Sequence, residues 1–314
     1  MSTGSHELQS WLEIPRITWP TLPDLPVLTN PFILPIGTRH IYIHSPTTLL
    51  KWGRTEEEGI MTSLAHSILG GVVPKVLGVV SISDQPGRTG LILQRQRGTL
   101  LVELWPTLSP EKRMIVKDRL RDLLVRMRKH PLDYYGRPGG RPYTTFTTFD
   151  AIDHAFCTTR TEWDESRIQA LRKVASDIGV DEAQRLALEQ VERGTRFDDR
   201  PVLTHGDLSD RNFLADPDTL EITGIIDWED ALVMPAHYEY ARARLSGGHK
   251  AEWRKELLDV LRDVLRVECA TAQGADGGRE SSGTYEKELE AWNNLVDVER
   301  AAQGFSDACY WTFE

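Results

Sequence analysis

Four polar residues near the middle of the sequence have types and spacing that suit the transfer of a phosphoryl group. His205, Asp207 and Asn212 stand in the run HGDLSDRN, and Asp227 follows in the run IIDW. In the pattern H-x-D-L-x-x-x-N with a later Asp, the first Asp orients and deprotonates a hydroxyl group, while the Asn and the second Asp hold Mg²⁺. We therefore predict Asp207 as the catalytic base and Asn212 and Asp227 as magnesium ligands. His205 completes the catalytic loop, and we expect it to brace the loop by hydrogen bonds rather than to exchange protons.

The residues around this loop predict the elements that would bring these side chains together. Residues 201–203 form a short apolar run, and residues 213–215 and 221–226, separated by a DPD turn, are typical of a β-hairpin. Such a hairpin returns Asp227 to the neighbourhood of Asn212, as shared coordination of Mg²⁺ by hard oxygen ligands requires. The alternative is that the polar residues only cap turns and strand ends.

A lysine and a glutamate in the first hundred residues could hold a nucleotide phosphate. Residues 47–53 predict a strand that carries Lys51, and the residues from Thr55 to Ile68 predict an amphipathic helix that carries Glu58. An ion pair between the two would fix the ammonium group against the α and β phosphates. Glu58 also fits a capping box with Thr55, so both interpretations stay open. Residues 76–82 and 90–93, joined by a turn, predict two further strands.

Together these stretches resemble the aminoglycoside phosphotransferase and choline kinase-like family, in particular its phosphotransferase members from fungal genomes. The stretches that carry the resemblance are GTR (37–39), KWG (51–53), Glu58, VPKV (73–76), GTL (98–100), WPTLS (105–109), HGDLSDRN (205–212), IDWE (226–229) and EY (239–240). The resemblance implies an α+β, two-lobed protein-kinase-like fold with a small β-rich N-lobe and a larger, mainly helical C-lobe. It also implies that Mg²⁺ and ATP, or GTP, serve to phosphorylate a hydroxyl group of a small molecule.

The same resemblance assigns residues to the nucleotide. It makes Lys51 the phosphate contact and Glu58 its partner. It also places the hinge between the lobes at residues 93–97, with Leu93, Gln94 and Gln96 as nucleotide-binding positions. Because adenine recognition at such a hinge is mostly by backbone groups, these side chains do not distinguish ATP from GTP.

Three positions depart from related patterns. Only Gly37 stands where the family often has a glycine-rich phosphate loop, and Tyr238 stands where many relatives carry Trp. Gly206 replaces the Arg that receives an activation-loop phosphate in regulated protein kinases, and Asp227 is close in sequence to Pro235. With little room for an activation loop, we expect a small hydroxylated substrate rather than a peptide.

The composition limits the partners and the compartment. The chain has 314 residues, 40% of them hydrophobic, and a net charge of −10, which disfavours nucleic acid and anionic membrane as partners. Cys157, Cys269 and Cys309 show no metal-binding spacing and suit a reducing compartment. Since the first residues lack a basic and apolar leader, we expect a cytoplasmic protein with no protein partner evident.

The expected organisation is a proline-rich strap at residues 1–36, an N-lobe at 37–97 and a C-lobe at 98–314. A partner-binding tail is the alternative for the strap. Helices are predicted at 162–178, 181–192, 249–270 and 285–302, while residues 143–156 have no clear assignment. A helix is also predicted from Pro110, with these residues packed inside: Ile115, Leu120, Leu123, Leu124 and Met127.

Substrate residues cannot be assigned from the late helices. Four acidic candidates are expected to be solvated or structural: Glu162, Asp164, Glu239 and Glu290. Four tryptophans are expected to pack in the core rather than to line a pocket: Trp163, Trp253, Trp292 and Trp311. Two other functions stay open: a nucleotide-binding pseudokinase or scaffold, and a metal-dependent hydrolase with His205, Asp207, Asp227 and His237 around the metal.

Overall fold

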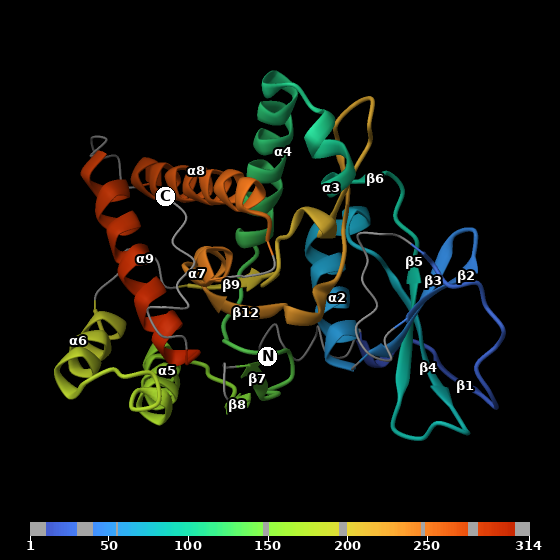
Figure 1. Ribbon diagram of the computed structural model, residues 1–314, viewed down its shortest axis with the longest axis horizontal. Coiled ribbons are helices and arrows are strands. Elements are labelled where there is room, and N and C mark those ends of the chain that lie inside the picture. Colours follow the sequence, from blue (N-terminus) through green and yellow to red (C-terminus); the bar gives the residue numbers. More distant parts are fainter. Residues whose placement is uncertain are drawn as a thin grey trace. The chain divides into compact units, whose positions relative to one another are not determined.

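The computed structural model describes residues 11–29, 40–54, 56–146, 151–194, 200–245, 249–275 and 282–304 (Figure 1). The chain divides into two compact units. The first unit comprises Met1–Leu123 and Asp207–Ala231, and the second comprises Leu124–Gly206 and Leu232–Glu314. The first unit thus takes in the expected N-lobe range, 37–97, together with residues 98–123 and the segment from the catalytic loop to the end of the hairpin.

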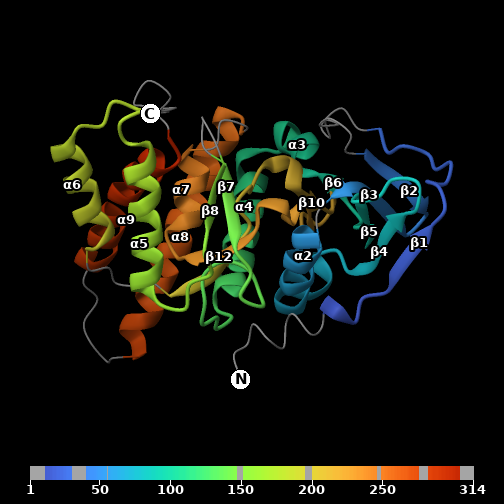
Figure 2. The ribbon, with the colours of Figure 1, turned by 90° about the horizontal axis from the view of Figure 1, so that it is seen from below.

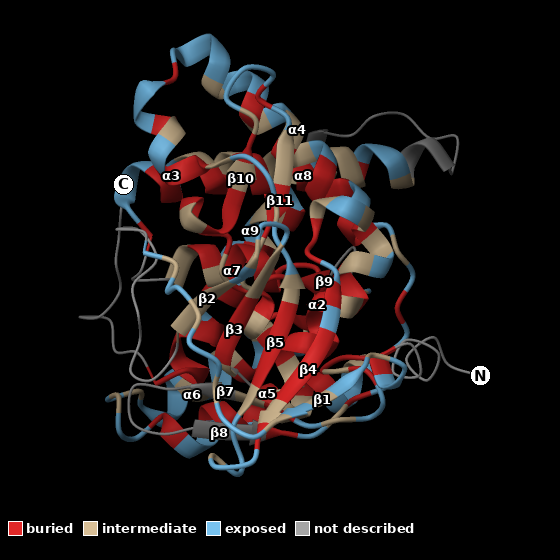
Figure 3. Ribbon diagram, turned by 90° about the vertical axis from the view of Figure 1, so that its right-hand side faces the viewer, coloured by how far each residue is buried: buried red, intermediate tan, exposed pale blue. Residues whose placement is uncertain are grey.

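A mixed sheet forms the centre of the first unit. In the described ranges its strand order is β1-β4-β5-β3-β2, antiparallel except for the parallel pair β1–β4. The strands are β1 (Arg16–Trp19), β2 (His40–Ser45), β3 (Thr48–Arg54), β4 (Val76–Ile82) and β5 (Thr89–Gln94). The middle of β3, β4 and β5 is buried (Figure 3). The alternation of side chains along β3 places Leu50 and Trp52 in one apolar cluster, as a period of two requires.

Helix α2 (Glu56–Leu69) packs against this sheet. Ile60 of α2 lies in a cluster with Trp11, Val79 and Leu91. Trp11 approaches so closely that a Cβ on Gly59 would stand 2.1 Å from its ring, which explains the glycine at this helical position. The described residues 11–29 therefore lie along the sheet, with β1 pairing with β4.

A smaller three-stranded sheet carries the hairpin that follows the catalytic loop. Its order is β11-β10-β6, and the strands are β6 (Thr99–Leu100), β10 (Phe213–Ala215) and β11 (Ile222–Ile225). The hairpin predicted from the sequence is confirmed. The short helices of this unit are η1 (Gly70–Val72), α3 (Leu101–Leu104), η2 (Trp105–Thr107), η3 (Asp210–Asn212) and η4 (Trp228–Asp230).

Helix α4 (Pro110–Arg128) begins at the predicted proline, but one of its expected core residues is wrong. Ile115 is 43% exposed, whereas the neighbouring Val116 is fully buried. Val116 stands four residues before the buried Leu120, so the apolar stripe follows the helical period from Val116 instead. The other expected core residues, Leu123, Leu124 and Met127, are buried.

The second unit is mainly helical. Its helices are α5 (Arg160–Val174), α6 (Glu182–Glu192), α7 (Tyr238–Leu245), α8 (Ala251–Ala275) and α9 (Ser282–Ala302). Helix α9 contacts the other four, and Figure 2 shows α5 and α6 beside it. The sequence predicted all of these helices except α7.

Two pairs of strands accompany these helices. Strands β9 (Pro201–Thr204) and β12 (Leu232–Pro235) are antiparallel, and β7 (Tyr143–Phe146) pairs with β8 (Ala151–His154) in the stretch that the sequence left unassigned. Trp163, Trp253 and Trp292 are buried, as expected for core residues, and Trp311 lies outside the described residues. In the described part of the chain, no helix has the length and apolar character needed to cross a membrane.

Candidate functional site

Lys51 is the centre of a buried charge cluster in the first unit. It lies in the middle of β3, between Ile41 of β2 and Leu91 of β5. Its Nζ donates to the carboxylate of Glu58 and, at 2.5 Å, to Oδ1 of Asp227. A strand, the helix that follows it and the end of a hairpin distant in sequence thus meet at one ammonium group.

Glu58 forms the ion pair that the sequence suggested. It lies in the first turn of α2 and is only 1% exposed, so its charge needs a partner of opposite sign. Lys51 provides that partner. The competing capping box would need Thr55, which lies outside the described residues.

Asp227 is the most accessible member of this cluster. Its side chain is 31% exposed, against 8% for Lys51. Its backbone is in the left-handed region, with φ 67° and ψ 61°, at the junction of β11 and η4. Few residues other than glycine adopt this conformation, and such strain is concentrated at functional sites. The strained backbone places on Lys51 a carboxylate that solvent can still reach.

Asp207 and Asn212 form a second pair in the same unit. The Asn212 amide nitrogen donates to the main-chain oxygen of Asp207 at 2.8 Å and to its Oδ2 at 3.0 Å. The Ile226 amide donates to the Asn212 carbonyl at 2.9 Å, one residue before Asp227. The hairpin therefore brings Asp227 back toward Asn212, as predicted.

The oxygen atoms of this group suit a hard divalent cation. Because the amide nitrogen of Asn212 is engaged by Asp207, its Oδ1 is the atom left to offer to a metal. Together with the partly exposed carboxylate of Asp227, it gives the carboxylate and amide oxygens that Mg²⁺ prefers. The donor set therefore fits the predicted magnesium, and the roles of the individual residues stay predictions.

His205 and Gly206 are held by a buried residue of α7. The carboxylate of Glu239 accepts from the His205 amide at 2.6 Å and from the Gly206 amide at 3.1 Å. Arg242, one turn later, donates to the Gly206 carbonyl at 3.2 Å. Burial raises the pKa of Glu239, although His205 and the two amides act in the opposite direction. The sequence expected a solvated or structural role for Glu239, and its structural role is this support of the loop backbone.

The hinge residues predicted from the resemblance lie at the end of β5 and just after it. Leu93 is half-buried against the cluster around Trp11, and the Gln94 amide donates to the Lys75 carbonyl at 2.9 Å. With its amide nitrogen turned toward the Gly71 and Thr223 carbonyls, at 3.2 and 3.1 Å, Gln96 ties η1 to β11. Its side chain therefore has a structural partner on each side. The expected phosphate-loop position, Gly37, lies outside the described residues.

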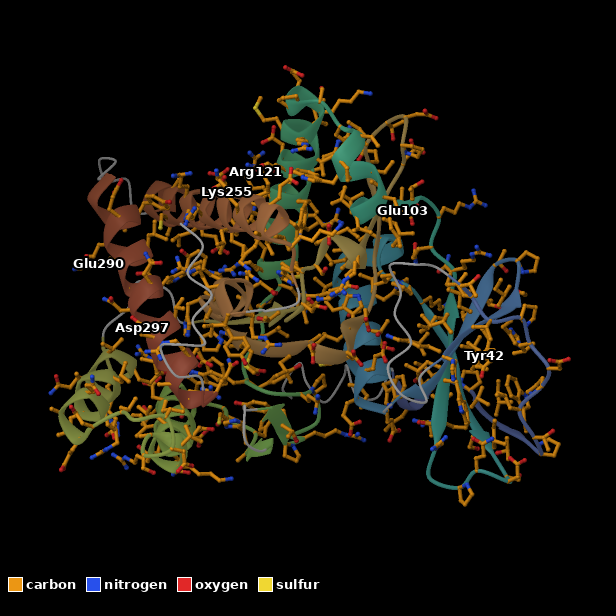
Figure 4. All side chains as sticks on the ribbon, viewed as in Figure 1. Tyr42, Glu103, Arg121, Lys255, Glu290 and Asp297 are labelled. Atoms are coloured by element: carbon orange, nitrogen blue, oxygen red, sulfur yellow. The ribbon has the colours of Figure 1, made fainter. Side chains whose placement is uncertain are left out.

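The remaining acidic candidates have structural or exposed positions. Glu162 completes a capping box with Thr159 at the start of α5, and Asp164 lies 3.2 Å from Arg160. Glu290 is exposed on α9, from which it projects in Figure 4. Within the described ranges, no three or more His, Cys, Asp and Glu side chains form a group that could hold a metal, including those of the hydrolase alternative.

Comparisons with known proteins agree with this architecture. A family model described as a phosphotransferase enzyme family matches residues 54–276. A search of curated proteins gave no match. A solved structure of a thermostable mutant of aminoglycoside phosphotransferase APH(4)-Ia, in ternary complex with ADP and hygromycin B, matches with a TM-score of 0.54 and 15% identity, over 91% of this chain and 88% of that chain.

A second structure of a mutant of that phosphotransferase, in ternary complex with AMP-PNP and hygromycin B, matches with a TM-score of 0.53 and 17% identity, over 91% of this chain and 93% of that chain. At these identities the likeness shows the fold alone. It confirms the kinase-like fold, with a mixed sheet in the N-terminal region and a helical C-terminal region, that the sequence predicted.

Proposed function

We propose that this chain, which belongs to the phosphotransferase enzyme family, transfers the terminal phosphoryl group of ATP or GTP to a hydroxyl group of a small molecule. The observation that carries the proposal is the meeting of Lys51, Glu58 and Asp227 in the unit that also holds the Asp207–Asn212 pair. A cation, a hydroxyl-orienting carboxylate and hard oxygen ligands are the groups that phosphoryl transfer requires.

Each of these residues has a distinct task in the proposed reaction. Lys51, held by Glu58, binds the nucleotide phosphates without losing side-chain freedom when the nucleotide arrives. Asp207 accepts the proton of the attacking hydroxyl group, and the hydrogen bond from Asn212 keeps its carboxylate oriented. Asn212 and Asp227 would hold Mg²⁺, which supplies positive charge to the phosphate oxygens.

Lys51 and Asp227 must part for this arrangement to form. In the structure the carboxylate of Asp227 is engaged by Lys51, at 2.5 Å. Nucleotide phosphates carry negative charge, so they can replace Asp227 on the ammonium group while Asp227 turns to the cation. The partial exposure of Asp227 supports such an exchange.

The small-molecule acceptor is supported by the fold and by the sequence. The two solved structures named above are of an aminoglycoside phosphotransferase bound to a nucleotide and hygromycin B. Only residues 228–234 separate Asp227 from Pro235, and part of that stretch is strand β12, which leaves little room for an activation loop. A peptide substrate is therefore disfavoured.

The decisive experiment compares the thermal midpoint of the purified protein with Mg-ATP, with Mg-GTP and with ATP plus EDTA. Binding to the folded state raises the midpoint. We expect a magnesium-dependent rise of several degrees that is lost in Asp227→Ala. Asp207→Ala is the matched control: it should keep the rise and lose turnover on any hydroxylated substrate that the wild type phosphorylates.

Other outcomes would select the alternatives. No rise with either nucleotide would reject the proposal, and a rise without any turnover across a panel of hydroxylated metabolites would favour a pseudokinase. Zinc or manganese retained through purification would favour a hydrolase. Full activity in Asp207→Ala would show that the base is assigned to the wrong residue.

A further inference from the structure

The second unit contains a pocket that is lined by none of the residues given a task in the proposed reaction. It has a volume of about 790 Å³ and lies between the end of β8 and one face of α5, and both elements can be followed in Figure 2. Its lining includes His154, Phe156, Cys157, Thr161, Ser166 and Gln169. The volume is in the range of sites for small organic ligands.

A chain of buried polar groups ends at this pocket. The fully buried Arg167 is paired with Glu299, its Nη2 donating to the carboxylate at 2.6 Å. Nη1 of Arg167 lies 3.3 Å from Nε2 of His154, and Nδ1 of His154 lies 2.8 Å from the hydroxyl of Ser166. His154 and Ser166 both line the pocket.

The direction of these hydrogen bonds is fixed by Arg167. A guanidinium group can only donate, so Nε2 of His154 must accept and Nδ1 must carry the hydrogen. His154 then donates to the Ser166 oxygen, whose own hydrogen is left for another acceptor. No acceptor for that hydrogen appears in the described ranges, so Ser166 presents a hydrogen-bond donor.

The direction of the hydrogen bond from His154 to Ser166 excludes a catalytic role for Ser166. A nucleophilic serine needs a histidine nitrogen that accepts its proton, and Nδ1 of His154 already carries a hydrogen. Burial and the charge of Arg167 lower the pKa of His154 from 6.5 to about 3, so the ring stays neutral. The pocket therefore has the chemistry of a binding site.

The acidic side chains of the pocket are already engaged within the chain. Glu162 accepts from the amides of Thr158 and Thr159 at 2.7 and 3.2 Å. Glu165 accepts from Arg193 at 3.0 Å. A cationic ligand would have to displace these partners, and an anionic ligand would meet two carboxylates. Lys173 also lines the pocket and already has an interaction within the chain. The other polar groups of the lining are hydroxyl, amide and imidazole groups, and Phe156 and Cys157 belong to its less polar part.

We propose that this pocket binds a neutral, hydroxyl-bearing small molecule with an apolar portion, such as a glycoside of an aromatic alcohol. The Ser166 hydroxyl donates to a ligand oxygen, Thr161 and Gln169 contact further hydroxyl groups, and the aromatic portion lies against Phe156. The pocket proposal stands on these contacts alone, and only the use of the ligand as phosphate acceptor rests on the proposed function.

Three matched fluorescent probes test the ligand class. They are 4-methylumbelliferyl β-D-glucoside, which is neutral, the corresponding glucuronide, which is anionic, and the 2-amino-2-deoxyglucoside, which is cationic. We expect fluorescence anisotropy of the full chain without nucleotide to show binding of the glucoside. Both charged probes should bind at least about fivefold more weakly, because the charged side chains of the lining, Glu162, Glu165 and Lys173, already have partners within the chain. Equal or tighter binding of a charged probe, or no binding of the glucoside, would overturn the proposal.

Variants test the location. Ser166→Ala removes the donor and should weaken the glucoside about fivefold, as the loss of one hydrogen bond predicts. Gln169→Trp fills the pocket from an exposed position, where the fold tolerates it, and should abolish binding. Ser176→Ala, beyond the end of α5 and outside the lining, is the matched control. Unchanged binding in Gln169→Trp would place the probe elsewhere and reject the site.

Adding Mg-ATP separates this proposal from the proposed function. Phosphorylation of the bound glucoside by the wild type, and not by Asp207→Ala, would make the pocket the acceptor site. Binding without transfer supports the pocket and rejects its use as the acceptor site. Failure of the proposed function would appear independently, as the absence of a magnesium-dependent midpoint rise with nucleotide.

Discussion

Each unit of the molecule contains a buried ion pair, and the two differ in how far they are closed to solvent. In the first unit, Lys51 and Glu58 are joined by Asp227, whose side chain is 31% exposed. In the second unit, the side chains of Arg167 and Glu299 are 0% and 1% exposed. The interactions are chemically alike, but only the first has a member that can exchange partners.

This difference separates a site from a structural support. The Arg167–Glu299 pair, called the sealed pair below, has already lost its hydration. The attraction between its two charges only offsets the free energy of that dehydration. In the Lys51 cluster, we propose that an incoming phosphate and cation take over the interactions of the native partners. Burial of charge alone therefore does not identify a functional site, and our proposal for the Lys51 cluster rests on its partly exposed second partner, Asp227.

Breaking the sealed pair should have the largest effect on stability. Glu299→Gln leaves the Arg167 charge buried without its counter-ion, and we expect a loss of about 3–5 kcal/mol in the free energy of unfolding, measured by urea denaturation. Burial alone would lower the pKa of Arg167, but Glu299 together with Tyr238, Tyr143 and Glu192 outweighs it, and the pKa is raised above its usual range. Because a guanidinium group is not deprotonated in proteins, Arg167 of the variant stays charged in the folded state, where its charge is buried without the Glu299 carboxylate.

An exposed ion pair gives the matched control. Arg266 and Asp263 on α8 are 55% and 41% exposed, so Asp263→Asn should cost less than about 1 kcal/mol. If Glu299→Gln lowered the free energy of unfolding no more than Asp263→Asn does, the burial of Arg167 would not depend on the charge of Glu299. The double variant Arg167→Met, Glu299→Leu should recover much of the loss, since apolar residues can replace a buried pair.

The two clusters also differ in how far the sequence predicts them. Lys51, Glu58 and Asp227 each stand in a local pattern: a strand, the first turn of a helix and the end of a hairpin. Those patterns, with the resemblance, predicted the pair of Lys51 and Glu58, whereas the contact between Lys51 and Asp227 required the structure. Arg167 and Glu299 are 132 residues apart, and each alone looks like an ordinary polar residue of a helix. Their burial arises only when α5 packs on α9, which no local pattern reveals.

The errors elsewhere have the same origin. Ile115 and Val116 are both apolar neighbours, and only the tertiary contacts of α4 decide which of them is buried. The residue types of β7 (YTTF) favour a strand and those of α7 (YEYARARL) favour a helix, but both elements are too short to show a periodic pattern. The sequence thus predicted the fold class and most elements, while the support that Glu239 gives to the loop required the structure.

A substitution of Lys51 tests the nucleotide contact that we propose for the first unit. Lys51→Met removes the charge that we propose for the nucleotide phosphates, so the dissociation constant of Mg-ATP should rise about thirtyfold, which is about 2 kcal/mol. Isothermal titration calorimetry measures it directly. Lys75→Met, at an exposed lysine next to β4, is the control and should bind as the wild type does. Equal affinity in Lys51→Met would remove Lys51 from the nucleotide site.

The pH dependence of stability tests whether His154, which lies next to Arg167 of the sealed pair, is closed to water. It has the smallest expected effect. The pKa of His154 is lowered from 6.5 to about 3, by burial first and by Arg167 second, so its folded-state pKa lies below its unfolded value. Its contribution to stability is therefore fully present above pH 6.5 and is lost as the pH falls toward 3. Between pH 6.5 and 5 the loss should be about 1.6 kcal/mol. His154→Gln, which keeps an oxygen for Arg167 and an N–H for Ser166, should lack this component, so the difference between the two unfolding free energies should shrink at low pH. A constant difference would mean that His154 is protonated in the folded protein as easily as in the unfolded chain, and that the polar network at the pocket is open to water.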